Sequence, residues 1–376
     1  MSNPAFGTFY LPGPTEVRPE ILAALTRPLI EHRGREFQAM FARIESGLRD
    51  ALLTGRPVYV STSSGTGLME LAIRNTPPGR ILSLVSGGFA ERFALMGEAC
   101  DREVERLGIP WGTMFDLAEV ERKLSSGSWS AVTVTHSETS TGALNDVRAI
   151  ADLAHKYGAS VLVDSVSGAG GAELCVDSWK LDFVFTASQK ALAMPPGLAF
   201  GVASAEFLER ARTVRGRGHY FDIFQFDEFA AKNETPTTPA TSLLYALDAQ
   251  LANIMREGIE RRWERHVRMR EMTAAWVERC GNRLDVDLGI LAPGGHRSPT
   301  VTVVTLPAGI SGGDVCSEVA KRGFTIGPGY GKLRSNSFRI GHMGDHTPEG
   351  LDKCLAVCEE AIEALVRPRA ALRIAR

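Results

Sequence analysis

The sequence lacks any long hydrophobic run and any excess of one charge. Its apolar stretches fall well short of the roughly 20 residues that cross a bilayer, and 42 Lys and Arg residues oppose 44 Asp and Glu residues. Such a balance gives no attraction to nucleic acids or to membrane surfaces. The opening residues show no basic region followed by an apolar stretch, so we expect no secretory signal. We therefore expect a cytoplasmic protein with neither membrane nor nucleic-acid partners.

Cysteine is scarce, and the signatures of several enzyme classes are missing. The six cysteines are scattered without CxxC spacing, which is typical of a reduced cytoplasmic protein. No cluster of histidines and carboxylates suggests a metal site, so we expect no metal, and no GxSxG sequence marks a serine hydrolase. The GxGxxG fingerprint of dinucleotide-binding proteins also fails, because Gly65 and Gly67 are followed by Glu70 where the third glycine is required.

Strand and helix patterns alternate over the first half of the chain. With 376 residues, the chain is long enough for two domains. Apolar runs predict strands at residues 58–60, 80–85, 102–106, 131–135, 160–163 and 183–186. Helical periodicity falls between them, at residues 67–74, 89–100, 116–124 and 146–157. This alternation indicates an α/β fold with a mainly parallel sheet that helices cover on both faces.

The last third of the chain has a different pattern. Helical stretches at 242–280 carry many charges, and they are followed by short strands and helices at 300–306, 312–322, 337–341 and 347–366. This mixture suggests a smaller α+β domain after the large one. We place an N-terminal arm at residues 1–15, a large domain at 16–256 and a small C-terminal domain at 257–376.

Lys190 lies on a short connection between two apolar runs, and this connection contains two prolines and a glycine. A lysine at the junction of two buried strands loses its solvation. Burial lowers the pKa of an ammonium toward the range where the free amine is a nucleophile. A lysine that forms a Schiff base requires this environment. The alternative is an ordinary surface lysine in a loop.

Two further groups are predicted at the same edge of the sheet. Ser64, Gly65 and Thr66 follow the first predicted strand and open a helix, where free backbone N–H groups and hydroxyls can bind a phosphate. Asp164 ends the strand at 160–163, and ligands of open parallel sheets bind at the carboxyl ends of the strands. Each has a plainer interpretation, because Ser–Gly turns and aspartates often only cap helices.

One strand edge thus combines a lysine, a carboxylate and a phosphate site, with the polar segment 136–142 beside them. Pyridoxal 5′-phosphate (PLP) requires such a set of groups. A lysine binds its aldehyde, a carboxylate keeps its ring nitrogen protonated, and a helix N-terminus takes its phosphate. The sequence therefore predicts PLP as the cofactor.

Several short segments also match the signatures of a known family, in the same order along the chain. They lie at residues 13–14, 32–34, 138–142, 163–165, 188–192, 195–197 and 338–341. These segments resemble the class V aminotransferases, specifically the alanine/serine–glyoxylate (serine–pyruvate) branch. The resemblance implies fold type I of PLP-dependent enzymes, with a mainly parallel seven-stranded sheet in the large domain and a smaller C-terminal α+β domain.

The resemblance implies roles for the residues of the sheet edge. Lys190 would bind the cofactor and move the substrate proton, and Asp164 would pair with the pyridinium nitrogen. The remaining cofactor contacts would come from Ser64, Gly65, Thr66 and Gln189 at the phosphate, Thr139 at the phenolic oxygen and Phe89 against the ring. Phe89 stands where the family often has a tryptophan, so stacking is kept but the indole N–H is lost.

Two residues farther along the chain complete the implied site. Arg339 would bind the substrate carboxylate with its fork of N–H donors. Thr237 would reach the cofactor phosphate of the other subunit, which implies a homodimer with a shared active site. Glu234 stands where the family often has a tyrosine, and an acid at this position would repel the phosphate.

The function implied by the resemblance is transfer of an amino group from a small L-amino acid, alanine or serine, to a 2-oxo acid such as glyoxylate or pyruvate. A phosphoserine or 2-aminoethylphosphonate aminotransferase is an alternative, with Arg215, Arg217 and Arg334 as candidate phosphate ligands. A cysteine desulfurase would need a mobile cysteine, and Cys316 lies in a predicted helix start. A PLP-fold protein that only binds a partner is the alternative outside enzymes.

Overall fold

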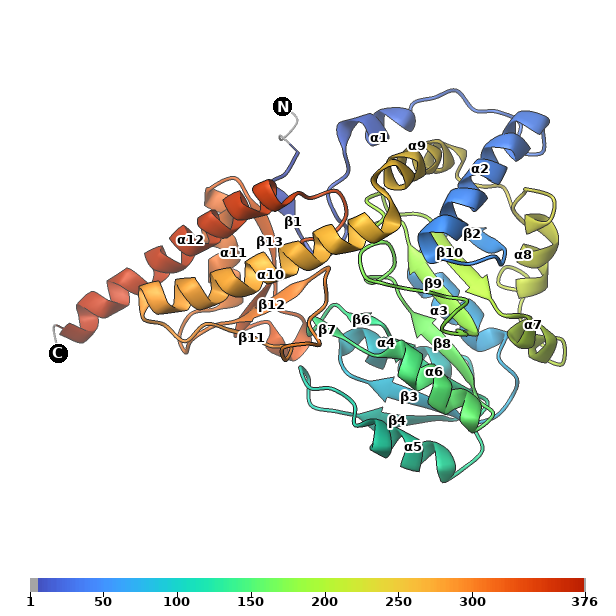
Figure 1. Ribbon diagram of the computed structural model, residues 1–376, viewed down its shortest axis with the longest axis horizontal. Helices are drawn as coiled ribbons and strands as arrows, with labels where there is room; N and C mark the ends of the chain where they lie inside the picture. Colours follow the sequence, from blue (N-terminus) through green and yellow to red (C-terminus); the bar gives the residue numbers. More distant parts are fainter. Residues whose placement is uncertain (1–5, 375–376) are drawn as a thin grey trace.

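The computed structural model describes the backbone of residues 6–374 and the side chains of residues 6–367. The chain forms one large and one small sheet, each covered by helices (Figure 1). The α/β architecture and the seven-stranded large sheet predicted from the sequence are confirmed. Within the described residues, none of the helices combines the length and the apolar composition needed to cross a bilayer.

The large sheet is parallel except for one strand. Its order is β2 (Val58–Ser61), β10 (Ala199–Ala203), β9 (Phe183–Ala187), β8 (Ser160–Asp164), β5 (Ala131–Thr135), β3 (Ile81–Val85) and β4 (Val104–Gly108). Only β10 runs antiparallel to its two neighbours. Every strand except the edge strand β4 is fully buried, as expected for a sheet with helices on both faces.

Alternate residues of each strand pack against opposite layers of helices. One face contacts α2 (Arg35–Leu52), α5 (Leu117–Ser125), α6 (Val147–Lys156) and α9 (Thr241–Glu257). The other face contacts α3 (Gly65–Arg74), α4 (Gly88–Ala99), α7 (Ala205–Ala211) and α8 (Ile223–Ala230). In β8, for example, Val161 and Val163 belong to the first core and Leu162 to the second, because successive side chains of a strand point to opposite faces.

The small sheet is assembled from both ends of the chain. Its order is β1 (Phe9–Tyr10), β13 (Thr325–Pro328), β14 (Ser337–Ile340), β12 (Thr302–Thr305) and β11 (Gly289–Ile290). It packs with α10 (Ile259–Leu284), α11 (Gly312–Lys321) and α12 (Pro348–Ile374). The remaining elements are α1 (Pro19–Ala24), the hairpin β6 (Ser137–Glu138) and β7 (Ala143–Leu144), and the 3-10 turn η1 (Gly331–Leu333).

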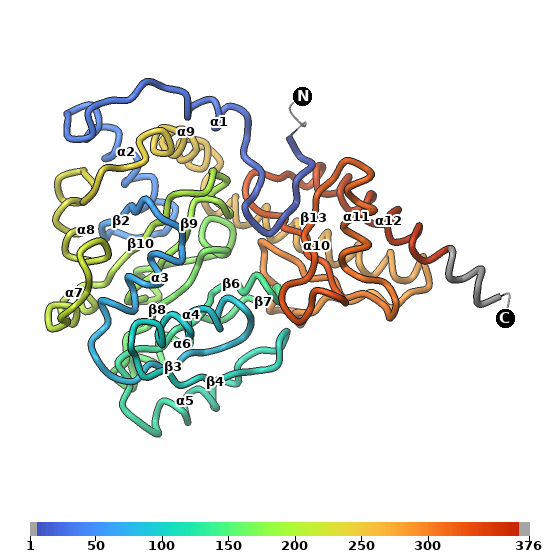
Figure 2. The backbone as a smooth tube through the Cα atoms, turned by 180° about the vertical axis from the view of Figure 1, so that it is seen from behind, coloured from blue at the N-terminus to red at the C-terminus, as the bar shows by residue number. Residues whose placement is uncertain are grey.

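The expected N-terminal arm is therefore part of the small sheet. β1 pairs in parallel with β13, and Figure 2 shows the N-terminal segment running beside β13; residues 1–5 of the arm lie outside the described residues. The long helical pattern at 242–280 is two helices, because Gly258 adopts a φ of +85° that ends α9 before α10 begins. The division of the chain near residue 256 stays a prediction.

Candidate active site

A cavity of about 360 Å³ lies at the carboxyl ends of the parallel strands. Several elements meet there: the end of β8, the turn after β9 and the N-termini of α3 and α4. Its lining includes the following residues predicted from the sequence: Ser64, Gly65, Thr66, Phe89, Asp164, Gln189 and Lys190. Gly13, Pro14, Met69, Arg92, Val166 and Pro196 complete the lining.

Lys190 is buried, with 8% of its surface exposed. It occupies a tight turn in which the Ala193 N–H donates to the Lys190 carbonyl at 2.8 Å. Its Nζ donates to the carbonyl of Pro12. Gly13 is required at this point, because a Cβ there would lie 2.4 Å from Nζ. Burial, reinforced by the positive charge of Arg339, lowers the pKa of Lys190 to about 8, which makes the free amine accessible near neutral pH.

Asp164 ends β8 and is also buried. Its Oδ1 accepts a hydrogen bond from the Val166 N–H at 2.9 Å, and no cation of the described residues forms an ion pair with it. Burial raises the pKa of Asp164 to about 7, and the charge of Glu138 adds to this rise. A carboxylate at this depth would be stabilised by a cation in the cavity.

The N-terminus of α3 meets the cavity with its backbone N–H groups uncapped. Ser64 is the N-cap residue, and its side chain accepts no capping hydrogen bond. Gly65 allows the close packing of this turn, because a Cβ there would lie 2.6 Å from Cγ2 of Val166. Beside it, the side-chain oxygen of Gln189 is buried without a hydrogen-bond partner among the described residues. The N–H groups of this helix start are free to donate to an anion such as a phosphate.

Arg339 lies in β14 of the small sheet and approaches the large one. Its Nε donates to the Pro328 carbonyl at 2.9 Å and its Nη1 to the Thr139 carbonyl at 3.4 Å. No acid of the described residues forms an ion pair with Arg339. The guanidinium carbon of Arg339 lies 5.5 Å from the centre of the Tyr330 ring. Arg339 does not line the cavity itself, but its charge acts on Lys190. A substrate carboxylate would supply the partner that Arg339 lacks.

Thr139 is buried, its carbonyl accepts from Arg339, and it is not among the residues that line the cavity. Its hydroxyl lies 2.5 Å from the hydroxyl of Ser167. Thr237, by contrast, is exposed on a loop of the large domain. Within one chain, the structure therefore brings the predicted residues Lys190, Asp164, Ser64 and Thr66 together at the cavity. Thr237 is not among the residues that line it.

Glu138 organises the site, and its role was missed in the sequence. Its buried carboxylate accepts hydrogen bonds from the N–H groups of Phe89 at 3.1 Å, Ala90 at 3.0 Å and Ser140 at 3.0 Å. An acid at this position caps α4 and interacts favourably with the positive end of the helix. The available signal was a helix start, Gly87–Gly88, without a capping side chain of its own.

Arg92 and Tyr330 were missed as well. The rings of Phe89 and Tyr330 lie 5.2 Å apart. The guanidinium of Arg92 lies 4.9 Å from the centre of the Phe89 ring and donates to the Tyr330 hydroxyl at 3.3 Å. Arg92 and Phe89 are three residues apart on α4 and share one face of it, so a helical-face argument could have found Arg92.

The sequence model of one family, described as "Aminotransferase class-V", matches residues 26–329. The chain belongs to the class V aminotransferases. An uncharacterised aminotransferase of Methanocaldococcus jannaschii is 35% identical, over 94% of this chain and 92% of its own. The L-aspartate–glyoxylate aminotransferase of Paracoccus denitrificans is 31% identical (92% and 87%). The serine–glyoxylate aminotransferase of Arabidopsis thaliana is 30% identical (98% and 93%).

The fold of this class V aminotransferase is also that of solved relatives. The crystal structure of an alanine–glyoxylate aminotransferase from Nostoc sp. superposes with a TM-score of 0.88 at 28% identity, and the match covers 94% of this chain and 95% of that one. These findings confirm the resemblance that the sequence showed. Because class V aminotransferases depend on PLP, the protein is a PLP-dependent transaminase.

The residues at the cavity suit PLP on structural grounds. Asp164 is a buried acid without a cationic partner among the described residues, and a protonated ring nitrogen is such a partner. The uncapped N–H groups of α3 can donate to a phosphate, and the amide of Gln189, whose oxygen has no partner among the described residues, can turn so that its NH2 group donates as well. No group of three or more His, Cys, Asp or Glu residues within the described part of the chain could hold a metal ion.

The sequence suggested that Glu234 would repel a phosphate. In the structure its carboxylate is bound within its own chain. Its carboxylate pairs with Nη1 of Arg33 at 2.5 Å and accepts from the Gln38 amide at 3.0 Å. Arg33 belongs to the segment 32–34 that resembles the family. The acid at position 234 is therefore neutralised within its own chain, which removes the objection to a phosphate contact near Thr237.

Prediction from the buried acid. The pKa of Asp164 is about 7 in the folded protein without cofactor, against 3.8 as its ordinary value. Between these pH values the folded state holds a proton that the unfolded state has lost, so Asp164 contributes stability that grows as the pH falls from 7 toward 4. Asp164→Asn removes this contribution. The unfolding free energy of the cofactor-free wild type minus that of the variant should rise by up to about 3 kcal/mol between pH 8 and pH 5.

Urea titrations of both cofactor-free proteins at the two pH values measure this difference. Titrating groups that do not interact with Asp164 are common to the two proteins and cancel in the subtraction; the exception is Lys190, whose pKa the charge of Asp164 raises. Equal pH dependence of the two proteins would show that Asp164 has an ordinary pKa.

Proposed function

We propose that this class V aminotransferase moves the amino group of a small L-amino acid, alanine or serine, to a 2-oxo acid, glyoxylate or pyruvate. The two half-reactions alternate on the same site in a ping-pong mechanism. The observation that carries the proposal is the juxtaposition of a buried amine, Lys190, with a buried acid, Asp164, near an arginine that lacks an acidic partner, Arg339. The three relatives whose names give substrates differ in donor, and their names share glyoxylate.

When bound, PLP supplies an aldehyde that condenses with amines and a ring that withdraws electrons from the substrate Cα. Lys190 then acts through its Nζ. A pKa near 8 leaves part of the amine unprotonated near neutral pH, so Nζ can accept the proton from the substrate Cα and return it. Asp164 holds the proton of the ring nitrogen. Asp164 must be ionised for this, although burial alone favours its neutral form, so the charge of the ring nitrogen would offset the cost of burying the carboxylate.

The other residues bind and orient. Ser64, Gly65, Thr66 and Gln189 would hold the phosphate, and the hydroxyl of Thr139 would donate to the phenolic oxygen. Phe89, whose backbone is fixed by Glu138, would stack on the ring. Arg339 would hold the substrate carboxylate and thereby fix the direction in which Cα faces Lys190.

The proposed alternatives receive less support. Arg217 is paired with Asp222 at 2.9 Å, and none of Arg215, Arg217 and Arg334 lines the cavity. The cavity does contain Arg92, which has no acidic partner among the described residues, so donors with a second acid group, such as L-aspartate, belong in the substrate panel. Against a cysteine desulfurase, Cys316 lies inside α11 and burial raises the pKa of its thiol to about 12.

We also propose a cytoplasmic homodimer in which Thr237 reaches the cofactor phosphate of the other subunit. Thr237 is exposed, and its loop lies at the large sheet, where the Ala240 N–H donates to Thr62 Oγ1 at 3.2 Å. Thr62 is two residues before the N-cap of α3. Sedimentation equilibrium of the purified protein tests this state, and a monomer that keeps full activity would contradict it.

Prediction for the lysine. Lys190→Ala removes the amine that condenses with PLP, so the variant should lack the yellow band at about 420 nm, whereas the wild-type band should bleach toward about 330 nm on addition of a productive amino donor. Absorbance spectra with a panel of L-alanine, L-serine and L-aspartate measure both effects. Lys353→Ala, on the exposed face of α12, is the control and should keep the band. A wild type that no amino donor bleaches would favour a protein that only binds a partner.

Prediction for the arginine. Arg339→Ala should raise the KM of every carboxylate substrate and lower kcat/KM, because a charge-assisted double hydrogen bond is lost. The lower kcat/KM should correspond to a loss of about 2–4 kcal/mol of transition-state stabilisation. Arg339→Lys should fall between the wild type and the alanine variant, since it keeps the charge without the fork. Steady-state kinetics with the productive donor and acceptor measure these constants. Arg334→Ala, on the exposed loop before β14, is the matched control, and an unchanged KM in Arg339→Ala would refute the assignment.

A further inference from the structure

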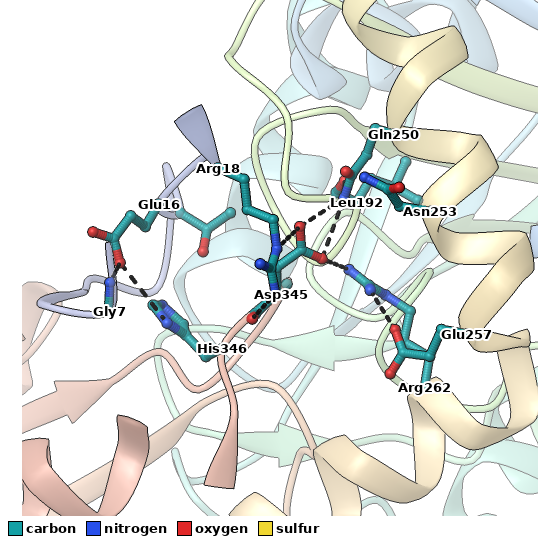
Figure 3. Close-up of polar contacts among 12 residues, drawn as sticks. Gly7, Glu16, Arg18, Leu192, Gln250, Asn253, Glu257, Arg262, Asp345 and His346 are labelled. Atoms are coloured by element: carbon teal, nitrogen blue, oxygen red, sulfur yellow. Dashed lines mark hydrogen bonds and ion pairs between the residues drawn. The ribbon is translucent and has the colours of Figure 1, made fainter. Parts of the chain in front are cut away.

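A buried polar network lies beneath the turn that carries Lys190 (Figure 3). Its centre is Asp345, with 7% of its surface exposed, and Arg262, with 1% exposed. Figure 3 shows the carboxylate of Asp345 between the side chains of Arg18, Gln250 and Arg262. Asp345 lies in the loop after β14. Its three partners come from the N-terminal segment, from α9 and from α10, so three other parts of the chain meet at its carboxylate.

Two side chains of the network hold the backbone next to Lys190. Nη2 of Arg262 donates to Oδ1 of Asp345 at 2.9 Å and to the carbonyl of Ala191 at 2.7 Å. Nε2 of Gln250 donates to Oδ2 of Asp345 at 3.0 Å and to the carbonyl of Leu192 at 3.1 Å. The two carbonyls that directly follow Lys190 are thus bound by the same donors that bind Asp345.

The backbone next to Asp345 is also anchored to α10. The preceding residue, Gly344, donates its N–H to Nε2 of His266 at 3.0 Å and accepts from Arg265 at 3.1 Å. Asp345 follows β14, the strand that carries Arg339. The proposed substrate arginine and the carboxylate that holds the Lys190 turn are therefore parts of one continuous segment.

Both carboxylates of the network, those of Asp345 and Glu257, are paired with arginines. Burial opposes ionisation of Asp345, but the charge of Arg262 and the hydrogen bond from Gln250 outweigh burial and lower the pKa of its carboxyl group. Arg262 forms a second ion pair with Glu257 at 2.8 Å, and Arg18 approaches Asp345 from the partly exposed side at 3.2 Å. Desolvation offsets much of the attraction in such a pair, so a buried pair is weak support for stability and points to a role in fixing one geometry.

We propose that Asp345 and Arg262 are positioning residues for Lys190: they fix the turn that carries its amine and connect this turn to the segment that carries Arg339. The proposal rests on the function proposed above, because it concerns the amine that condenses with PLP and moves the substrate proton. Neither residue lines the cavity at Lys190. Arg262 acts through the carbonyl of Ala191, and Asp345 acts through Arg262 and Gln250, which hold the carbonyls of residues 191 and 192.

The test uses Asp345→Asn, which removes the charge and keeps the shape, and Gln250→Met, which removes one donor and leaves the Arg262–Asp345 pair intact. Asp177→Asn is the matched control, because Asp177 pairs with Arg56 at 2.9 Å on the large domain and lines no part of the cavity. Cofactor-free protein is titrated with PLP, and the yellow band reports binding. Single-turnover rates with the productive donor, in its ordinary and its Cα-deuterated form, report proton transfer.

Asp345→Asn should weaken PLP binding and slow the single turnover by about 10- to 100-fold, as expected for a shift of about 1 Å at a reacting group. Its deuterium isotope effect should exceed that of the wild type, because proton transfer at the misplaced amine becomes the slower step. Gln250→Met should change both quantities in the same direction by a few-fold, since only one of the two carbonyls is released. Asp177→Asn should behave like the wild type.

Two outcomes would overturn the proposal. One is an Asp345→Asn protein with a lower melting temperature but wild-type PLP affinity and isotope effect, which would make the network purely structural. The other, decisive if Asp345→Asn fails to fold, is a Gln250→Met protein that is unchanged in both readouts. Failure of the function proposed above looks different, because the wild type itself would then bind PLP without converting any donor.

Discussion

The burial of the Lys190 amine is the constraint on which the rest of the site depends. An ammonium in a low-dielectric site is costly, and the structure places three compensating features around it: the Pro12 carbonyl, the charge of Asp164 and the room left by Gly13. The balance lowers the pKa of the amine without eliminating its protonated form. A surface lysine would have a normal pKa, and a lysine buried without these partners would be fixed as neutral.

The site is built from the ends of regular elements, and the packing of distant segments refines it. Asp164 lies at the end of β8, and the uncapped N–H groups lie at the start of α3. Glu138 then fixes α4 and with it Phe89. The large sheet alone is not sufficient, because Arg339 comes from the small sheet. A cavity at the edge of the large sheet is thus complemented by a charge from the small sheet, which we propose as the substrate-binding group.

Local patterns in the sequence were enough to predict the large sheet and the groups at its edge. Asp164 follows an apolar run, Ser64 to Thr66 open a helix, and Lys190 lies between two apolar runs; each signal spans only a few residues. The strands β1 and β13 were not predicted, because β1 has only two residues and half of β13 is glycine and proline, which are depleted in strands. Glu138 and the Arg262–Asp345 pair could not be predicted either, since their meaning lies in contacts between segments that are far apart in the chain.

The pairing of β1 with β13 has a consequence for biosynthesis. Residues 9–15 leave the ribosome early, yet their partners in the small sheet are made near the end of translation; the hydroxyl of Thr15, for example, donates to the carbonyl of Met343, 328 positions later. Contacts of such long sequence separation form late in folding. The strands of the large sheet can assemble on the nascent chain, whereas β1 can pair only after β13 has been made. The N-terminal segment therefore gains its finished environment only at the last stage of synthesis.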